Sequence, residues 1–405
     1  MIYRCLNCGG ALEFDTRTNK MTCNMCCSFF SMEMVTSQTE EEKQQMEELD
    51  ENNFCDDTNI FQEDTMECKV YHCNSCGAQL LIDEVESATY CAFCGQPTVV
   101  FQRVDKQKKP KYIIPFRITK ELALQKVRQR IDSGLFIPKE IKNVTMDRIR
   151  GIYIPYQIVD VTYEDTQVFS IVVSTKDSVQ KKRFYDIDGV AHFKQMTVDT
   201  SMQLNDESAM RLEPYEMVGL KEFEPAYLSG FYADCFDEDK FITRKKVERR
   251  AGKLYTEKIK EKIKRKSGRK PTLEFSKPTC EIEKMDSALL PAWFLVFHHN
   301  NESYTIMVNG QTGKVIGAVP LDEKKAVAMF LSISLLVSAL ITEMFKILCN
   351  ISPNNGIELI GWSFIGGILL WSLVWKRWKK YKYSQKLAKE VEIQQFSQKR
   401  GGDDT

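Results

Sequence analysis

The stretch from Cys5 to Cys26, CLNCGGALEFDTRTNKMTCNMC, decides the fold of the amino-terminal part of the chain. It holds two Cys-x2-Cys pairs separated by 14 residues, and the stretch from Cys73 to Cys94, CNSCGAQLLIDEVESATYCAFC, repeats that spacing 68 residues later. Four thiolates at this spacing are typical of a zinc ribbon, in which sulfur fills all four positions around a tetrahedral ion. No position stays open for water or a substrate, so we predict two structural Zn²⁺ ions.

The predicted zinc ligands form two sets. They are Cys5, Cys8, Cys23 and Cys26 for the first ion, and Cys73, Cys76, Cys91 and Cys94 for the second. Gly77 and Gly95 follow the cysteine pairs of the second ribbon, where the chain must turn with positive φ. Cys27 stands at the matching place in the first ribbon, where it is an alternative ligand to Cys26. Metal binding, worth on the order of 10–16 kcal/mol, supplies the folding free energy of so small a ribbon.

Disulfides and redox chemistry are the other uses of such cysteines. Disulfides need an oxidising compartment, and no secretory signal precedes Cys5. A redox-active Cys-x2-Cys usually occurs singly, at the start of a helix that follows a strand. We therefore expect zinc-bound thiolates in a reducing compartment.

The carboxy-terminal part of the chain holds two uncharged apolar runs, 326–342 and 359–375, of 17 residues each. As helices they would each rise roughly 26 Å, slightly less than the ~30 Å hydrocarbon core of a bilayer. The turn signal Pro353-Asn354-Asn355-Gly356 lies between them, which favours a transmembrane hairpin over two buried core helices. Basic residues flank the outer ends, so the positive-inside rule predicts cytoplasmic amino and carboxy termini. The expected location is the cell membrane, as a multi-pass protein with two spans.

The central part of the chain is expected to form an α+β body. Its strand patterns lie at 112–116, 151–163, 168–174 and 292–298, and its helix patterns at 120–133, 207–211 and 244–265. The pair 304–308 and 314–319, joined by Asn309-Gly310-Gln311-Thr312-Gly313, is a strong hairpin signal.

The sequence as a whole predicts a multidomain chain with two small β zinc ribbons, an α+β body and a transmembrane helical hairpin. Its segments are ribbon 1 at 1–30, an acidic flexible linker at 31–69, ribbon 2 at 70–102, a basic linker at 103–111, the body at 112–320, the hairpin at 321–380 and a cytoplasmic tail at 381–405.

Charge is segregated along the chain although the net charge is zero. Residues 31–69 carry 13 acids and two bases, whereas residues 240–270 carry 15 bases and three acids. We expect the basic helix to dock its apolar stripe on a sheet and to turn its cations to water. Anionic lipid, the acidic linker and nucleic-acid phosphates are its alternative partners. Residues 376–389, with seven bases and no acid, favour lipid headgroups.

The sequence carries no familiar catalytic motif. A phosphate loop, a dinucleotide-binding Gly-x-Gly-x-x-Gly, a His-Glu-x-x-His and a Gly-x-Ser-x-Gly are all missing, and the chain has only 4 histidines. We therefore expect a protein that is not an enzyme and has no small-molecule substrate.

A series of short motifs runs from the second ribbon through the body. They are YHCNSCGA at 71–78, YCAFCG at 90–95, IIPF at 113–116, GIYIPY at 151–156, AYLSGF at 226–231, LLPAW at 289–293 and NGQTGK at 309–314. In combination they resemble a bacterial family, common in Firmicutes, of TFIIB-type zinc ribbon-containing proteins, some labelled as replication-restart helicases. Some members are encoded beside phage-shock and flotillin-like (SPFH) envelope proteins. The resemblance therefore implies a membrane-linked adaptor.

Two functions of different class follow from these patterns. The first is a non-enzymatic, membrane-anchored adaptor that recruits a protein, of SPFH or phage-shock type by the resemblance, to the lipid bilayer. The alternative is a membrane-tethered nucleic-acid binder. Ribbon faces that bind nucleic acid tend to carry Lys and Arg, and the second ribbon has none between His72 and Gln102. We therefore favour a protein partner over nucleic acid.

Overall fold

The computed structural model of the chain describes most of its first 325 residues. The described ranges are 3–37, 65–73, 78–81, 91, 93, 101–134, 136–142, 149–174, 180–202, 204, 206–236, 238–299, 302–317, 319–320, 322 and 324–325, with isolated residues between 328 and 379.

The amino-terminal ribbon is a three-stranded antiparallel sheet of β1 (Leu12–Asp15), β2 (Lys20–Cys23) and β3 (Phe29–Phe30). Alternating apolar and polar residues place Leu12 and Phe14 of β1 on a buried face. Asp15 closes the β1–β2 turn, because its carboxylate accepts hydrogen bonds from the Arg17 N–H (3.1 Å) and the Thr18 hydroxyl (2.8 Å).

Eleven strands of the described chain form one mixed sheet, whose main path runs β10-β7-β12-β8-β11-β5-β4-β6, with β9 beside β8 and the β13–β14 hairpin beside β12. The strands are β4 (Thr65–His72), β5 (Gln79–Leu81), β6 (Phe101–Lys108), β7 (Tyr112–Ile113), β8 (Ile149–Ser174), β9 (Gln180–Asp199), β10 (Lys221–Glu222), β11 (Tyr232–Asp234), β12 (Thr272–His299), β13 (Glu302–Asn309) and β14 (Val315–Gly317). The helices are α2 (Lys120–Asp132), α3 (Lys139–Lys142), α4 (Asp206–Leu212) and α5 (Lys240–Ser267), with 3-10 turns at Met217–Gly219 and Pro225–Leu228.

Successive residues of β8 contribute to two core layers on opposite faces of the sheet. Tyr153 packs in the layer that contains α2, whereas Ile152 and Ile154 pack in the layer that contains α4. The sheet is therefore buried on both faces in its central part.

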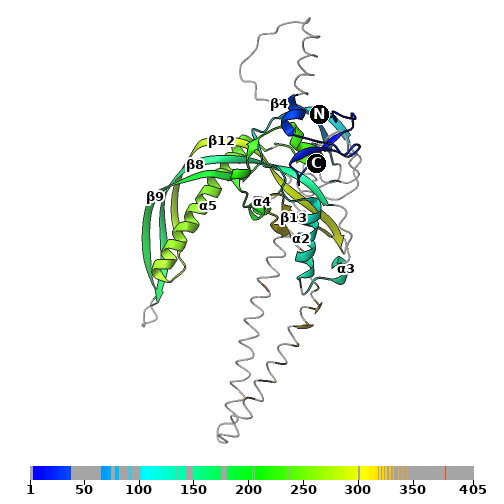
Figure 1. The fold of residues 1–405 in the computed structure, drawn as a ribbon. Helices are drawn as coiled ribbons and strands as arrows, with labels where there is room; N and C mark the ends of the chain where they lie inside the picture. Colours follow the sequence, from blue (N-terminus) through cyan, green and yellow to red (C-terminus); the bar gives the residue numbers. More distant parts are fainter. Residues whose placement is uncertain are drawn as a thin grey trace, which may run out of the picture.

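Three long strands extend beyond this core as a curved arm, with α5 in its hollow (Figure 1). β8, β9 and β12 have 26, 20 and 28 residues, and register shifts interrupt the β8–β9 and β8–β12 ladders. Strand twist and bulges of this kind coil a sheet. Val247, Ala251 and Tyr255 of α5 pack against the arm.

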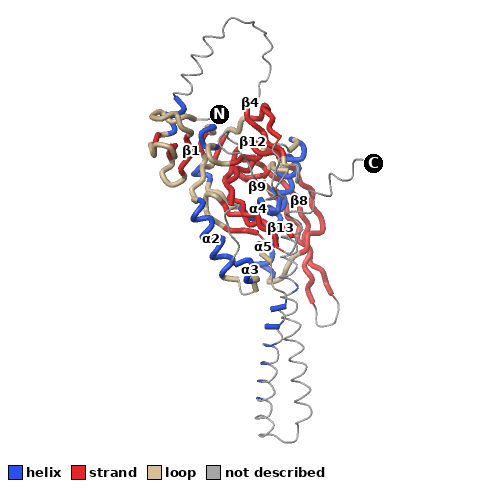
Figure 2. Tube along the Cα trace, turned by 90° about the vertical axis from the view of Figure 1, so that its right-hand side faces the viewer, coloured by secondary structure: helices blue, strands red, loops and turns tan. Residues whose placement is uncertain are grey.

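The amino-terminal ribbon is packed on the body. Phe14 meets Tyr227 edge to face at 5.2 Å between ring centroids, and the Phe14 N–H donates to the Ser229 carbonyl (3.2 Å). The ribbon lies on the same side of the sheet as α2 (Figure 2), and the two contribute to one apolar cluster.

Strands of the second cysteine segment belong to the large sheet. β4 pairs with β5 and β6, and β5 pairs with β11 of the body. β4 begins at Thr65, within the segment expected to be a linker, and β6 continues to Lys108, within the expected basic linker.

The fold class predicted from the sequence is wrong in two respects. The body is mainly β-structure, because the patterns at 151–163 and 168–174 belong to the single strand β8 and the pattern at 292–298 is the end of β12. The polar residues 164–167 between the two patterns are paired within β8, so a polar run inside one long strand looks like the gap between two short ones.

The predicted transmembrane hairpin at 321–380 is also wrong. No helix in the part of the chain that the structure describes is long and apolar enough to cross a membrane. The expected multi-pass cell-membrane location, with both termini cytoplasmic, is corrected with it. Only isolated residues of the run 326–342 are described, and the run 359–375 lies outside the described residues.

Candidate metal centre

The four cysteines of the first ribbon lie together. Their sulfur atoms are all within 4.8 Å of one another. Cys5 Sγ lies 3.4 Å from Cys26 Sγ, and Cys8 Sγ lies 3.5 Å from Cys23 Sγ. Four sulfurs around a tetrahedral zinc ion, at about 2.3 Å from the metal, would stand about 3.8 Å apart. This group could therefore bind a metal such as zinc.

The two cysteine pairs are held by matching backbone hydrogen bonds. The Cys5 N–H donates to the Gly10 carbonyl (2.7 Å), and the Gly9 N–H donates to the Cys5 carbonyl (2.8 Å). In the second pair the Cys23 N–H donates to Ser28 (3.0 Å) and the Cys27 N–H to Cys23 (2.9 Å). Each pair is thus a tight knuckle that points its two sulfurs to one side.

Cys27 has the backbone conformation expected of glycine. Its φ is 56°, close to the 71° of Gly9 at the matching place of the first knuckle. Cys26 belongs to the four-sulfur group and Cys27 does not. Cys27 is therefore the residue that turns the knuckle.

The electrostatics of the four sulfurs fit a site for a cation. Hydrogen bonding with Ser28 lowers the pKa of the Cys26 thiol to about 6. The Gly10 N–H favours a thiolate at Cys8, yet the neighbouring Cys26 and Cys23 sulfurs outweigh it and raise the pKa of Cys8 to about 12. Thiolates this close repel one another, so all four ionise near neutral pH only when a positive ion binds between them.

The second cysteine set is described in part. Cys73 and Cys91 are buried and pack with Ala78 and Phe93. The Cys73 N–H donates to the Ala78 carbonyl (2.9 Å), which repeats the Cys5–Gly10 bond of the first ribbon. Cys76 and Cys94 lie outside the described residues. One complete four-cysteine group is therefore shown.

The knuckles carry two exposed apolar side chains. Leu6 lies between the cysteines of the first pair and is 39% exposed, and Met25 lies between those of the second and is 80% exposed. Both stand on the loops that carry the four clustered sulfurs. The ribbon thus presents an apolar tip to its surroundings.

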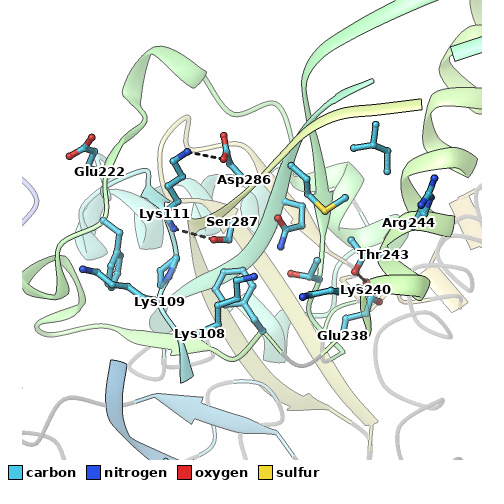
Figure 3. Close-up of a pocket in the computed structure, with 17 residues that line it drawn as sticks. Lys108, Lys109, Lys111, Glu222, Glu238, Lys240, Thr243, Arg244, Asp286 and Ser287 are labelled. Atoms are coloured by element: carbon cyan, nitrogen blue, oxygen red, sulfur yellow. Dashed lines mark hydrogen bonds and ion pairs between the residues drawn. The ribbon is translucent and has the colours of Figure 1, made fainter. Parts of the chain in front are cut away.

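A cleft of ≈ 1050 Å³ lies in the body (Figure 3), between the β6–β7 connection, β12 and the start of α5. Its charged lining residues are Lys108, Lys109, Lys111, Lys240 and Arg244, with Glu222, Glu238 and Asp286. Cations thus outnumber carboxylates in its walls.

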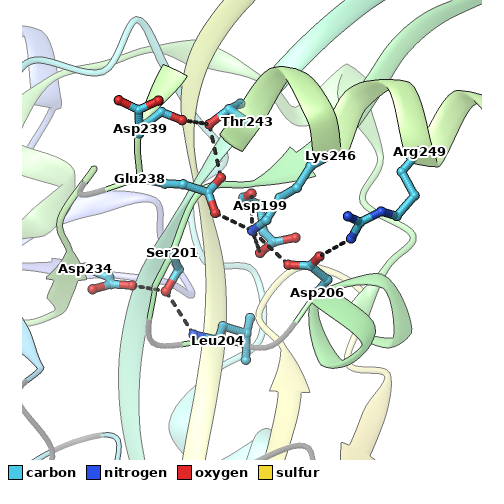
Figure 4. A network of polar contacts seen from close by, with 10 residues as sticks. All are labelled: Asp199, Ser201, Leu204, Asp206, Asp234, Glu238, Asp239, Thr243, Lys246 and Arg249. Atoms are coloured by element: carbon cyan, nitrogen blue, oxygen red, sulfur yellow. Dashed lines mark hydrogen bonds and ion pairs between the residues drawn. The ribbon is translucent and has the colours of Figure 1, made fainter. Parts of the chain in front are cut away.

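A buried ion network lies next to this cleft (Figure 4). Lys246 Nζ is 2.6 Å from Glu238 Oε1, 2.8 Å from Asp206 Oδ1 and 3.3 Å from Asp199 Oδ2. Burial raises the pKa of Asp199 to about 6 despite the attraction of Lys246. Burial opposes the charge of Lys246, yet the three carboxylates raise the pKa of its ammonium. The network ties α5 to the end of β9 and the start of α4.

Sequence reasoning missed the cleft and the network. Lys246 lies in a basic run whose cations were expected to face water, and its three acids come from separate segments. Only the long-range fold brings them together, so neither spacing nor composition signals them.

No protein-family model and no solved structure matches the chain. The chain is 27% identical over 347 residues to the uncharacterised protein YdjG of Bacillus subtilis, an alignment that covers 82% of this chain and 94% of that protein. The similarity is distant, and it fits an uncharacterised family of the Firmicutes type. The comparisons show no zinc-ribbon family.

Proposed function

We propose that the protein is a non-enzymatic zinc-ribbon adaptor that binds a protein partner with the tip of its amino-terminal ribbon. The observation that carries the proposal is the exposure of Leu6 and Met25 on the two knuckles. Exposed apolar side chains on a rigid frame are a common means of protein recognition, and methionine adapts to varied surfaces. In this proposal the metal keeps the ribbon tip folded and takes part in no reaction.

We infer that the metal is zinc and that the chain binds two ions. Four thiolates without a fifth ligand are typical of zinc or of an iron–sulfur centre. Two Cys-x2-Cys knuckles around a single ion favour zinc. The repeated knuckle bond at Cys73 supports a second ion on Cys73, Cys76, Cys91 and Cys94.

A protein partner fits the ribbon better than nucleic acid does. The ribbon has only three cationic residues, Arg4, Arg17 and Lys20, and the Arg17 guanidinium lies 3.7 Å from the Glu121 carboxylate. Nucleic-acid binding needs several cations to displace counterions from phosphates. By the family resemblance, an SPFH or phage-shock-type protein is our first candidate.

Affinity capture with the zinc-loaded full chain tests the proposal. Leu6→Ser/Met25→Ser should lose a protein that the wild type retains, because the apolar tip is removed while the cysteines stay. Val218→Ser is the matched control, since Val218 is 98% exposed and lies on a different part of the molecule. Zinc content should be equal in all three proteins.

Two results would contradict the adaptor function. One is equal retention of the same protein by wild type and the Leu6/Met25 variant. The other is salt-sensitive binding of a DNA duplex that the same double substitution abolishes.

A further inference from the structure

The cleft in the body has cations on both sides (Figure 3). Lys108, Lys109 and Lys111 come from the end of β6 and the connection to β7, and Lys240 and Arg244 come from the first turns of α5. The first turn of α5 contains no acidic residue. Asp239 caps this helix, because its carboxylate accepts a hydrogen bond from the Phe241 N–H (2.7 Å), so the positive charge of the cleft comes from its side-chain cations.

Two of the three carboxylates in the cleft are already held by lysines. Asp286 contacts Lys111 (3.0 Å) and Lys284 (2.8 Å), and Glu238 contacts Lys246 (2.6 Å). Among the other charged residues of the lining, four cations stand against one carboxylate, that of Glu222.

One wall of the cleft is a strand edge. β7 pairs with β12 only at Ala288 and Leu289, and the Lys111 N–H donates to the Ser287 carbonyl (3.0 Å). The preceding Pro110 has no N–H, so the row of hydrogen bonds ends there. Among the described residues, β12 upstream of Ser287 pairs with β8 alone.

This edge carries backbone hydrogen-bonding groups and an apolar surface that an added strand could contact. Alternate residues of a strand turn their peptide groups to the same side, so Met285 directs its N–H and C=O to the edge that Ser287 shares with Lys111. The Met285 side chain is 40% exposed, and Ile282 lines the cleft beside it. An extended chain placed here would continue the line of β7.

We propose that this cleft binds an extended acidic segment of a partner protein, which adds to the edge of β12 as a further strand. Main-chain hydrogen bonds to β12 supply the pairing, and alternate side chains of the segment face the cations and Met285. The site lies in the body and is separate from the ribbon tip, so it goes beyond the adaptor function proposed above.

Fluorescence anisotropy with the zinc-loaded full chain tests the site. The probe is a labelled peptide of alternating glutamate and valine, about ten residues long, which matches a cationic strand edge. Lys109→Glu/Arg244→Glu should weaken binding about tenfold or more, because two wall cations are reversed. Lys258→Glu/Lys262→Glu is the control: both residues are exposed on α5 outside the cleft, and the net charge change is the same.

Two further probes separate strand addition from simple charge attraction. Two further peptides carry methyl groups on one or the other alternating set of amide nitrogens, which keeps their charge and removes hydrogen-bond donors. The peptide methylated on the set that faces β12 should bind about tenfold more weakly than the unmethylated peptide. Leu6→Ser/Met25→Ser should bind the unmodified peptide as the wild type does, which distinguishes this site from the ribbon tip.

Equal weakening by the cleft and control variants, equal affinity for methylated and unmethylated peptides, or tighter binding of a DNA duplex would each overturn the proposal. The first result would assign the binding to net charge, the second would exclude strand addition, and the third would make the cleft a nucleic-acid site.

Discussion

Cys27 turns the second knuckle with φ 56°, a conformation that costs a residue with a Cβ roughly 1 kcal/mol relative to glycine. Cys27→Gly should therefore raise the free energy of unfolding of the zinc-loaded protein by up to about 1 kcal/mol, as measured by chemical denaturation. Cys5→Ser should instead lose zinc from the first ribbon. Loss of zinc from Cys27→Gly would show that Cys27, and not Cys26, is a ligand.

Asp199 should make stability depend on pH. Burial and competition for one ammonium raise its pKa from 3.8 to about 6. Between these values the folded protein holds a proton that the unfolded chain has released, so the free energy of unfolding falls as pH rises through this window. The Asp199→Asn variant has no titrating group at this position. Its free energy of unfolding should therefore fall less across this pH window than that of the wild type, by on the order of 3 kcal/mol.

Urea denaturation at about pH 4 and about pH 7 measures this effect as the difference between wild type and variant. Acid loss of zinc is common to both proteins and cancels. The two proteins would show parallel pH profiles if Asp199 titrated normally.

Packing against the arm selects the buried face of α5. The apolar residues of this helix include Leu254, yet the structure buries Val247, Ala251, Tyr255 and Ile263 and leaves Leu254 37% exposed. The curved arm meets the helix along a row of residues spaced by four, and a stripe chosen by hydrophobicity alone overlooks the tyrosine.

Val247→Ala should lower the free energy of unfolding by about 2 kcal/mol or more, because Val247 is fully buried against the arm. Leu254→Ala, on the same helix, should cost less than about 1 kcal/mol. Thermal or chemical denaturation measures both. Equal costs would mean that α5 does not lie in the hollow of the arm.

Local signals predicted several elements well. The helix patterns at 120–133, 207–211 and 244–265 correspond to α2, α4 and α5, and the Asn309–Gly313 turn joins β13 to β14. These elements depend on capping, periodicity and turn chemistry, which neighbouring residues determine. The length of β8 and the joining of β4–β6 to the large sheet depend on long-range pairing, which no local pattern carries.

The candidate sites likewise differ in whether neighbouring or distant residues form them. Cysteine spacing alone brought Cys5, Cys8, Cys23 and Cys26 into one predicted site, and the structure places their sulfurs together. The cleft and the Lys246 network combine residues from distant segments, so they emerge only from the fold.

Zinc removal should unfold the ribbon and leave the arm intact. The ribbon shares an apolar cluster with the body through Phe14 and Tyr227, but α5 and the arm have clusters of their own. Hydrogen exchange after chelation should therefore rise at 3–30 and at Pro225–Leu228, and stay low in α5. A rise along the whole chain would mean that the metal holds the body together as well.

X-ray absorption at the zinc edge of the full chain tests whether the metal centre is closed and structural. We expect only sulfur neighbours, four to each ion at about 2.3 Å. An oxygen or nitrogen ligand in the first coordination shell would reveal an open position for water or substrate, and would contradict a non-enzymatic role for this centre.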